Sequence, residues 1–306
     1  MIIKHLKYRE IDKDKWDQAL SSASNSIVYA TSGYLDIVCN HSWEALISED
    51  WQWIMPLTVK RKLGISYLPT PLFVQQLGIF GPEQPTEEII LSFISALPKD
   101  IKLIEYQFNH ANNKLLNVRI AANIRRNLVL SIDANYHRDK QKLYNTNTNR
   151  NIKKALNERL LIKQTEPMKV AEIFAENRGR KIKNINRNWL QVFDKLCKAD
   201  IPHRKVHAFE AVNSQDEFLA GVVVFEAFNR HILIVTASTE QGKSKSAMHL
   251  LLDNYLTRLP AGQLFDFEGS DNQQLALFYK GFGASEANYL HLKINNLPWY
   301  LKWLKR

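Results

Sequence analysis

The sequence contains very little cysteine. Its 306 residues include only Cys39 and Cys197, which lie far apart and form no CxxC pair. This excludes a disulfide framework and a cysteine-based zinc site, and it fits a reducing compartment. Long hydrophobic runs are also missing, because the apolar stretch around Leu219–Phe225 is far shorter than the roughly 20 residues of a membrane helix. The first residues, MIIKHLKYREIDKDKW, have no apolar core of signal-peptide length. We therefore expect a soluble, cytoplasmic protein.

Several nucleotide-binding and catalytic motifs are absent as well. There is no GxGxxG fingerprint and no GxSxG elbow. Gly242-Lys243-Ser244 resembles the end of a P-loop, but Ala237 occupies the position of the required earlier glycine. His203 and His207 are four residues apart but lack the glutamate of an HExxH zinc motif. The sequence therefore predicts no metal.

The overall composition is that of an ordinary globular protein. Hydrophobic residues make up 45% and charged residues 24% of the chain, which excludes disordered, collagen-like and coiled-coil classes. The length favours two domains of about 150 residues each.

Positive charge is concentrated in one segment. Lys and Arg number 41 against 31 Asp and Glu, a net charge of +10. Residues 138–205 contain 18 basic and 7 acidic side chains, so this segment carries +11 and the rest of the chain −1. The densest parts are Arg150–Lys154 and Arg178–Lys183. Few aromatics are interleaved, so base stacking is not indicated, and we expect a phosphate-bearing donor or acceptor, with tRNA possible. The alternative is a set of solvated helix faces.

The second half of the chain predicts a mixed α/β sheet, in α+β order, with helices on its faces. The predicted helices are 139–157, 168–178, 187–198, 244–259 and 272–279. The predicted strands are 158–164, 205–212, 218–228, 231–238, 263–267 and 285–294, with a tight hairpin at Asn229-Arg230.

The first half predicts a weaker copy of this order. Helices are expected at 12–22, 33–40 and 86–97, and strands at 44–48, 52–60, 101–106 and 127–132. A Gly- and Pro-containing loop is expected over 63–82.

Two blocks in the second half can carry chemistry. In Gly242–Ala247, the amides at a helix N-terminus together with Lys243 and Lys245 would attract phosphate, while the alternative is a helix capped by Ser244 or Ser246. In the second block, Asp266 and Glu268 alternate with Phe265 and Phe267, which places both carboxylates on one side of a strand. Such carboxylates are either functional or satisfied by amides of the following turn.

These blocks resemble a known superfamily. Asn272-x-x-x-Ala276-x-x-Tyr279-x-Gly281-Phe282 resembles the closing helix of the GNAT acyltransferases. Residues 266–270 with 278–283, and the basic run 148–155, resemble the Fem-type peptidyltransferases, which join two GNAT-like domains. The resemblance implies a degenerate GNAT-like domain over residues 1–140. It further implies a GNAT-like acyltransferase domain over 141–306 that opens with a basic helix.

The resemblance also implies an activity, the N-acylation of an amine. Fem-type enzymes move an amino acid from aminoacyl-tRNA onto a cell-wall precursor. The motif position makes Tyr279 the candidate general acid and Glu268 or Asp266 the candidate base. The candidate substrate-binding residues are Lys243, Lys245, Ser246, Arg150, Lys153, Lys154 and Lys280.

The donor-binding loop departs from the GNAT pattern. The GNAT pyrophosphate loop reads Gln/Arg-x-x-Gly-x-Gly/Ala, whereas from Gln241 the glycine positions hold Ser244 and Ser246. This places conventional CoA binding in doubt, and we expect no tightly bound cofactor. The alternatives are an acyl-CoA-dependent N-acyltransferase, or a non-catalytic tandem domain that binds RNA or a phosphorylated glycan. Trp299 and Trp303, beside basic residues, allow peripheral membrane contact, and the alternative is docking of this segment onto the protein's own body.

Overall fold

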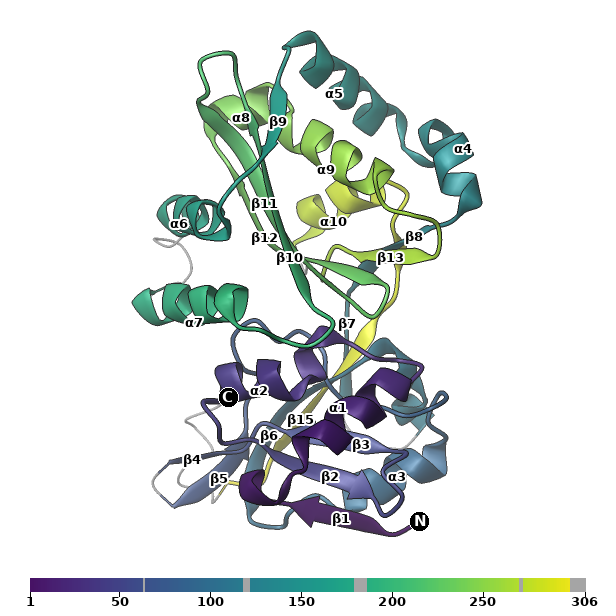
Figure 1. Ribbon diagram of the computed structural model, residues 1–306. Coiled ribbons are helices and arrows are strands. Elements are labelled where there is room, and N and C mark those ends of the chain that lie inside the picture. Colours follow the sequence, from purple (N-terminus) through teal and green to yellow (C-terminus); the bar gives the residue numbers. More distant parts are fainter. Residues whose placement is uncertain (63, 118–121, 179–185, 270–271, 298–306) are drawn as a thin grey trace. The chain divides into compact units, whose positions relative to one another are not determined.

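The computed structural model describes residues 1–62, 64–117, 122–178, 186–269 and 272–297 (Figure 1). The chain divides into two compact units. Unit 1 comprises residues 1–125 and 288–306, and unit 2 comprises residues 126–287. The basic residues 179–183, the end of the 266–270 motif and the tryptophans at 299 and 303 lie outside the described residues.

Unit 1 contains two sheets surrounded by short helices. The three-stranded sheet has the order β1-β2-β3, and the five-stranded sheet has the order β4-β5-β6-β15-β7. Its strands are β1 (Ile3–Leu6), β2 (Glu44–Ser48), β3 (Ile54–Leu57), β4 (Lys60–Lys62), β5 (Ile65–Leu68), β6 (Ile101–Phe108), β7 (Ala122–Arg125) and β15 (Tyr289–Asn295). Its helices are η1 (Tyr8–Glu10), α1 (Lys13–Ser22), η2 (Val28–Ala30), α2 (Ser32–Cys39), α3 (Glu87–Ser95) and η3 (His110–Asn117).

Unit 2 is built on one seven-stranded mixed sheet of order β14-β8-β13-β12-β11-β10-β9. Its strands are β8 (Leu128–Ile132), β9 (Leu161–Gln164), β10 (Lys205–Val212), β11 (Phe218–Ala227), β12 (Arg230–Ser238), β13 (Gln263–Asp266) and β14 (Ser285–Glu286). Its helices are α4 (Ala134–Leu143), α5 (Thr146–Asn157), α6 (Pro167–Arg178), α7 (Arg187–Lys198), α8 (Glu240–Ser244), α9 (Ala247–Thr257) and α10 (Gln273–Lys280). The pair β12–β13 is parallel, and the other pairs in this sheet are antiparallel.

Helices cover both faces of the unit 2 sheet. Figure 1 shows α6 on one side of β10–β12 and α9 with α10 on the other. Val222 and Val224 of β11 point into the core formed with α9 and α10, whereas Gly221, the residue before Val222, faces Val170 of α6. This alternation follows from the two-residue period of a strand, and it explains why β11 is apolar at nearly every position.

Most elements predicted for the second half are present. The hairpin turn between β11 and β12 is shifted by one residue, since Phe228 and Asn229 take the left-handed φ values of 51° and 55° and Arg230 already pairs with Ala227. The helix predicted over 139–157 is two helices, α4 and α5, and the one over 244–259 is α8 followed by α9.

The unit boundaries differ from a division after residue 140. β8 belongs to unit 2, because it pairs with β13 and β14. The strand predicted over 285–294 is divided at Asn288, because β14 pairs with β8 whereas β15 returns to unit 1 and pairs with β6 and β7. No described helix is both long and apolar enough to cross a membrane.

Candidate functional site

The parallel strands β12 and β13 separate part of the way along their length. They pair only where Arg230–Ile232 faces Leu264–Asp266. β12 continues to Ser238, so among the described residues the stretch 233–238 has no ladder partner on its β13 side. We call this gap the β12/β13 opening. Backbone groups on this edge make no ladder bonds to β13, so they can contact a bound molecule.

A β-bulge lies at the start of the opening. Val223 of β11 pairs with Val235, while Val224 pairs with Leu233, so Ile234 is an extra residue in β12. A bulge bends its strand and takes one residue's backbone groups out of the ladder. A preorganised backbone N–H of this kind can stabilise a developing oxyanion.

The carboxyl end of β12 leads directly into α8. Gly242 of α8 packs against β11, and a Cβ on this glycine would lie 1.9 Å from the carbonyl oxygen of Leu219. The glycine that resembles a P-loop residue is thus required for close packing of helix on strand.

The backbone amides of this segment are bonded within the segment itself. The Gly242 N–H donates to Thr239 Oγ1 at 2.9 Å and the Lys243 N–H to the Thr239 carbonyl at 3.0 Å. The N–H groups of Lys245 and Ser246 donate to carbonyls of α8 at 3.0 and 3.1 Å. A pyrophosphate loop needs such amides to point at the ligand, so these four are poorly suited to bind one.

The basic helix α5 packs along α9, near the start of that helix. Lys245 Nζ lies 2.8 Å from a carboxylate oxygen of Glu158, and Ser246 Oγ donates to Asn151 Oδ1 at 3.2 Å. Ser246 is the N-cap residue of α9, with φ of 58°, but its side chain makes no capping bond to the helix. The structure therefore brings two predicted substrate-binding residues, Lys245 and Ser246, together with the predicted basic helix.

The other predicted substrate-binding residues are more scattered. Arg150, Lys153 and Lys154 are exposed on α5 within one turn of each other. Lys243 is held by Glu240 at 2.5 Å on α8. Lys280 pairs with Glu286 at 2.6 Å, beyond the end of α10, and has no described bond to α5 or α8.

Asp266 and Glu268 have different surroundings. Asp266 is 1% exposed, lies 3.6 Å from Arg230, and accepts the Glu268 N–H at 2.8 Å. Burial raises the pKa of Asp266, while the Arg230 guanidinium opposes this effect. Glu268 is half-buried just after β13, with a left-handed φ of 58°. Non-glycine residues in this conformation are strained, and they often occur at functional sites.

Tyr279 and the other GNAT-like motif residues belong to the core of unit 2. Tyr279 is 4% exposed, and its ring lies against Phe267 with a centroid distance of 4.7 Å. Ala276 and Phe282 are also buried. A Cβ at Gly281 would lie 2.4 Å from Thr148 Oγ1, so this glycine lets α10 approach α5. The motif thus has a clear packing role.

Sequence reasoning missed His249, which lies beside Asn151 at 3.3 Å and against Phe278 with a ring distance of 4.8 Å. Burial lowers the pKa of His249 to about 4, so the ring is neutral at pH 7. It also missed Ile234, because the bulge arises only from pairing with β11. The one available signal for His249 was its position three residues after Ser246, on the same face of the helix.

Two surface hollows, of about 430 and 650 Å³, lie in unit 1. The first is lined by α1 and the turn at Asp50, and the second by Met1, Ile3 and α3. Neither contains a predicted site residue. We assign the candidate site from strand geometry and chemistry, because hollow size alone does not identify reactive groups.

Comparisons with known proteins give a consistent fold. No family model and no curated protein sequence matches the chain. Among solved structures, FemX is 13% identical with a TM-score of 0.69, covering 100% of both chains. A tandem GNAT protein from the clavulanic acid biosynthesis pathway is 11% identical with a TM-score of 0.55, covering 97% of this chain and 99% of that one. L-PGS from Bacillus licheniformis is 10% identical with a TM-score of 0.54, covering 96% and 95%. The predicted mixed α/β class is confirmed, and the fold is of the Fem and tandem GNAT type.

Proposed function

We propose that unit 2 transfers an acyl group onto an amine at the β12/β13 opening. The observation that carries this proposal is the combination of diverging parallel strands with a bulge at Ile234. The opening lies in a fold that resembles FemX and a tandem GNAT protein over nearly the whole chain. Unit 1, by this proposal, is the degenerate member of the pair.

Each step of the proposed reaction is assigned to a group in unit 2. A neutral amine attacks the ester carbonyl, a C–N bond forms, and the C–O bond to the leaving hydroxyl breaks. Glu268, at the mouth of the opening, accepts the ammonium proton, and Tyr279 is the candidate donor to the leaving oxygen. Backbone N–H groups at the bulge stabilise the oxyanion. Asp266 positions Glu268 by accepting its N–H at 2.8 Å.

We further propose aminoacyl-tRNA as the donor. The internally bonded amides of residues 242, 243, 245 and 246 favour a donor other than CoA. The exposed Arg150, Lys153 and Lys154 of α5 supply positive charge beside α9, which suits a polyanionic donor. The acceptor class that accompanies the Fem-type resemblance is the amine of a cell-wall precursor, in the cytoplasm.

The test compares donors side by side. Purified protein is given a mixture of charged tRNAs, or acetyl-CoA and longer acyl-CoAs, with a muropeptide amine as acceptor. We expect acceptor-dependent loss of aminoacyl-tRNA and no binding of acyl-CoA by calorimetry. Turnover of acyl-CoA without turnover of tRNA would replace the donor assignment. Tight tRNA binding without any transfer would instead support a non-catalytic RNA-binding role.

A further inference from the structure

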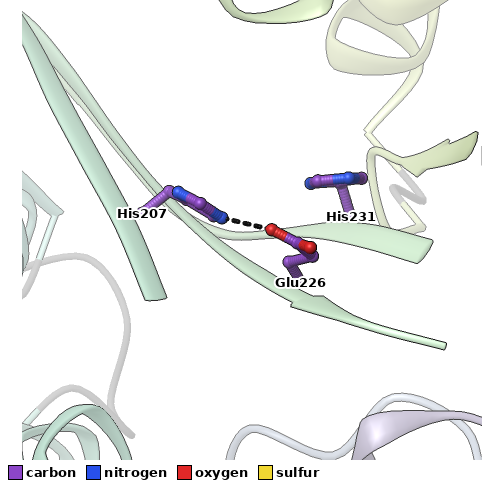
Figure 2. Close-up of side chains that lie close together, drawn as sticks. All are labelled: His207, Glu226 and His231. Carbon is purple, nitrogen blue, oxygen red and sulfur yellow. Dashed lines mark hydrogen bonds and ion pairs between the residues drawn. The ribbon is translucent and has the colours of Figure 1, made fainter. Parts of the chain in front are cut away.

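Two histidines and a glutamate lie on three adjacent strands of unit 2. His207 is on β10, Glu226 on β11 and His231 on β12. Glu226 and His231 are direct cross-strand partners, and His207 pairs with Val224, two residues before Glu226. Because directly opposed residues share a face, as do residues two apart on a strand, all three side chains emerge on the same face. Figure 2 shows Glu226 between the two imidazoles.

The three side chains are close enough to share one ion. One nitrogen or oxygen from each lies within 4.8 Å of the others. His207 Nε2 already lies 2.6 Å from Glu226 Oε2. Two imidazoles and one carboxylate form a common protein ligand set for zinc, with a fourth position left for solvent. Around an ion with bonds of about 2 Å the ligand atoms would move closer together, which requires only side-chain rotation.

The surroundings of His231 favour a ligating role. His231 is 4% exposed, and its Nδ1 lies 3.0 Å from the hydroxyl of Tyr255 on α9. Metal-bound histidines use their second nitrogen in this way, since the bond fixes the ring and leaves Nε2 for the metal.

The outer side of the cluster is open to solvent. The side chains of His207 and Glu226 are 29% and 26% exposed. Glu226 also pairs with Lys205, whose Nζ lies 3.1 Å from Glu226 Oε1. The Lys205 side chain is 71% exposed, so this ion pair is weak and a bound metal ion can displace it. A surface His–Glu pair commonly binds no metal. Here a third ligand, His231, is buried and held in one orientation, which an ordinary surface pair lacks.

We propose that His207, Glu226 and His231 form a site for one zinc ion or a similar divalent transition metal. The cluster sits at the start of β12, and the β12/β13 opening extends from Leu233 toward the other end of that strand. The site is therefore separate from the proposed acyl transfer and does not depend on it. Binding uses the lone pair of His207 Nε2, the nitrogen that lies 2.6 Å from Glu226 Oε2.

The experiment is a metal titration of the chelator-treated full-length protein. Zinc is followed by calorimetry, and cobalt(II) by its visible absorption, which is intense for four-coordinate sites. We expect one ion per chain with a dissociation constant in the micromolar range or below. H207A and E226Q should weaken binding at least about ten-fold, and Y255F by about the same factor through loss of the outer contact.

His203 provides the matched control, because it lies in the same segment, is exposed, and is the histidine that sequence spacing would pair with His207. H203A should bind zinc as the unaltered protein does. The proposal is overturned if the unaltered protein binds no stoichiometric ion. It is equally overturned if H207A and E226Q retain full affinity, or if H203A loses as much as they do. H207A and E226Q alter partly exposed side chains, so both are expected to fold.

Discussion

The two units differ in how the backbone of an extended segment is satisfied. In unit 2, β12 is a full strand that parts from β13 and leaves an opening. In unit 1, the segment from Leu77 to Phe80 pairs through isolated bridges, Leu77 to Phe108 and Ile54 to Phe80. Buried side chains hydrogen-bond the remaining backbone N–H and carbonyl groups of this segment. Asn112 Oδ1 accepts the Ile79 N–H at 2.8 Å, while Asn112 Nδ2 donates to the Ile79 carbonyl at 3.0 Å.

More polar groups complete this network in unit 1. Asn25 Nδ2 donates to the Ile79 carbonyl at 2.9 Å, and Tyr106 Oη accepts the Gly78 N–H at 3.1 Å. Gly78 has a φ of 111°, and a Cβ there would lie 2.2 Å from Asn112 Oδ1, so this position requires glycine. A satisfied buried network is costly to open. This difference supports the proposed assignment of substrate chemistry to unit 2 and of a structural role to unit 1.

The largest expected effect is on catalysis in unit 2. E268Q should lower the acyl-transfer rate at least about 100-fold, because an amide cannot accept the ammonium proton. The rate constant is measured in single-turnover transfer from charged tRNA. E268G is the companion variant, since it removes the carboxylate and also the left-handed strain at φ of 58°. It should be equally inactive but no less stable; an active E268G would exclude Glu268 as the base.

The next effect is on the stability of unit 1. N112A leaves an N–H and a carbonyl of buried Ile79 with fewer partners, and should lower the free energy of unfolding by about 2–3 kcal/mol. Urea unfolding measures this loss. The transfer rate per folded molecule should stay within about three-fold of the unaltered protein, because little binding energy is at stake in unit 1. A rate loss as large as that of E268Q would overturn the division of roles.

The third prediction concerns the close packing of α8 against β11. G242A should destabilise the protein by about 2 kcal/mol, because the new methyl group meets the backbone of Leu219. G262A is the matched control. Nothing lies within 4 Å of a Cβ at Gly262, so only its φ of 92° opposes the change, at about 1 kcal/mol. Equal losses in thermal or urea unfolding would show that packing on Leu219 is unimportant.

A fourth prediction concerns pH. The pKa of His249 is lowered by burial to about 4, from 6.5 in the unfolded chain. Between these values the unfolded state binds a proton that the folded state does not, so stability is full above pH 6.5 and falls as the pH drops toward 4. After allowance for partial exposure, the loss should be up to about 2 kcal/mol. Unfolding of H249Q should show a shallower slope, with the remainder from His231 and His291, whose pKa values burial also lowers, whereas the exposed H203Q should retain the full slope.

The smallest effect belongs to the α8 surface. Lys243 and Glu240 form an exposed pair, with side chains that are 59% and 90% accessible. K243A should change the free energy of unfolding by less than about 0.5 kcal/mol, which thermal unfolding can check. If Lys243 contacts donor phosphate, tRNA affinity should fall and the salt dependence should become shallower, with no loss of stability. A stability loss above 1 kcal/mol would instead mark the pair as structural.

The sequence predicted local features of this molecule better than non-local ones. The period of apolar residues located α6, α7, β10 and β11 closely, since these depend on neighbours along the chain. The bulge at Ile234, the return of β15 to unit 1 and the meeting of His207 with His231 depend on strand pairing between distant segments. Local sequence carries little information on such pairing.

The candidate site was only partly predictable for the same reason. Lys245, Ser246 and the basic helix were predicted from charge and helix position, and they do come together. The burial of Asp266 against Arg230, which fits the alternative of a satisfied carboxylate, required the sheet to be assembled. The left-handed conformation of Glu268 is unusual for a glutamate, and the residues next to it in the sequence do not predict it.

Hydrogen–deuterium exchange with and without an amide-linked, non-hydrolysable aminoacyl-tRNA tests the account most directly. We predict that this tRNA slows exchange in peptides covering residues 233–246, along the β12/β13 opening and α8. Peptides covering residues 77–81 should be unchanged, since the proposed donor site lies in unit 2 and these residues belong to unit 1. Protection confined to residues 77–81, with none over 233–246, would contradict the assignment of the reaction site to unit 2.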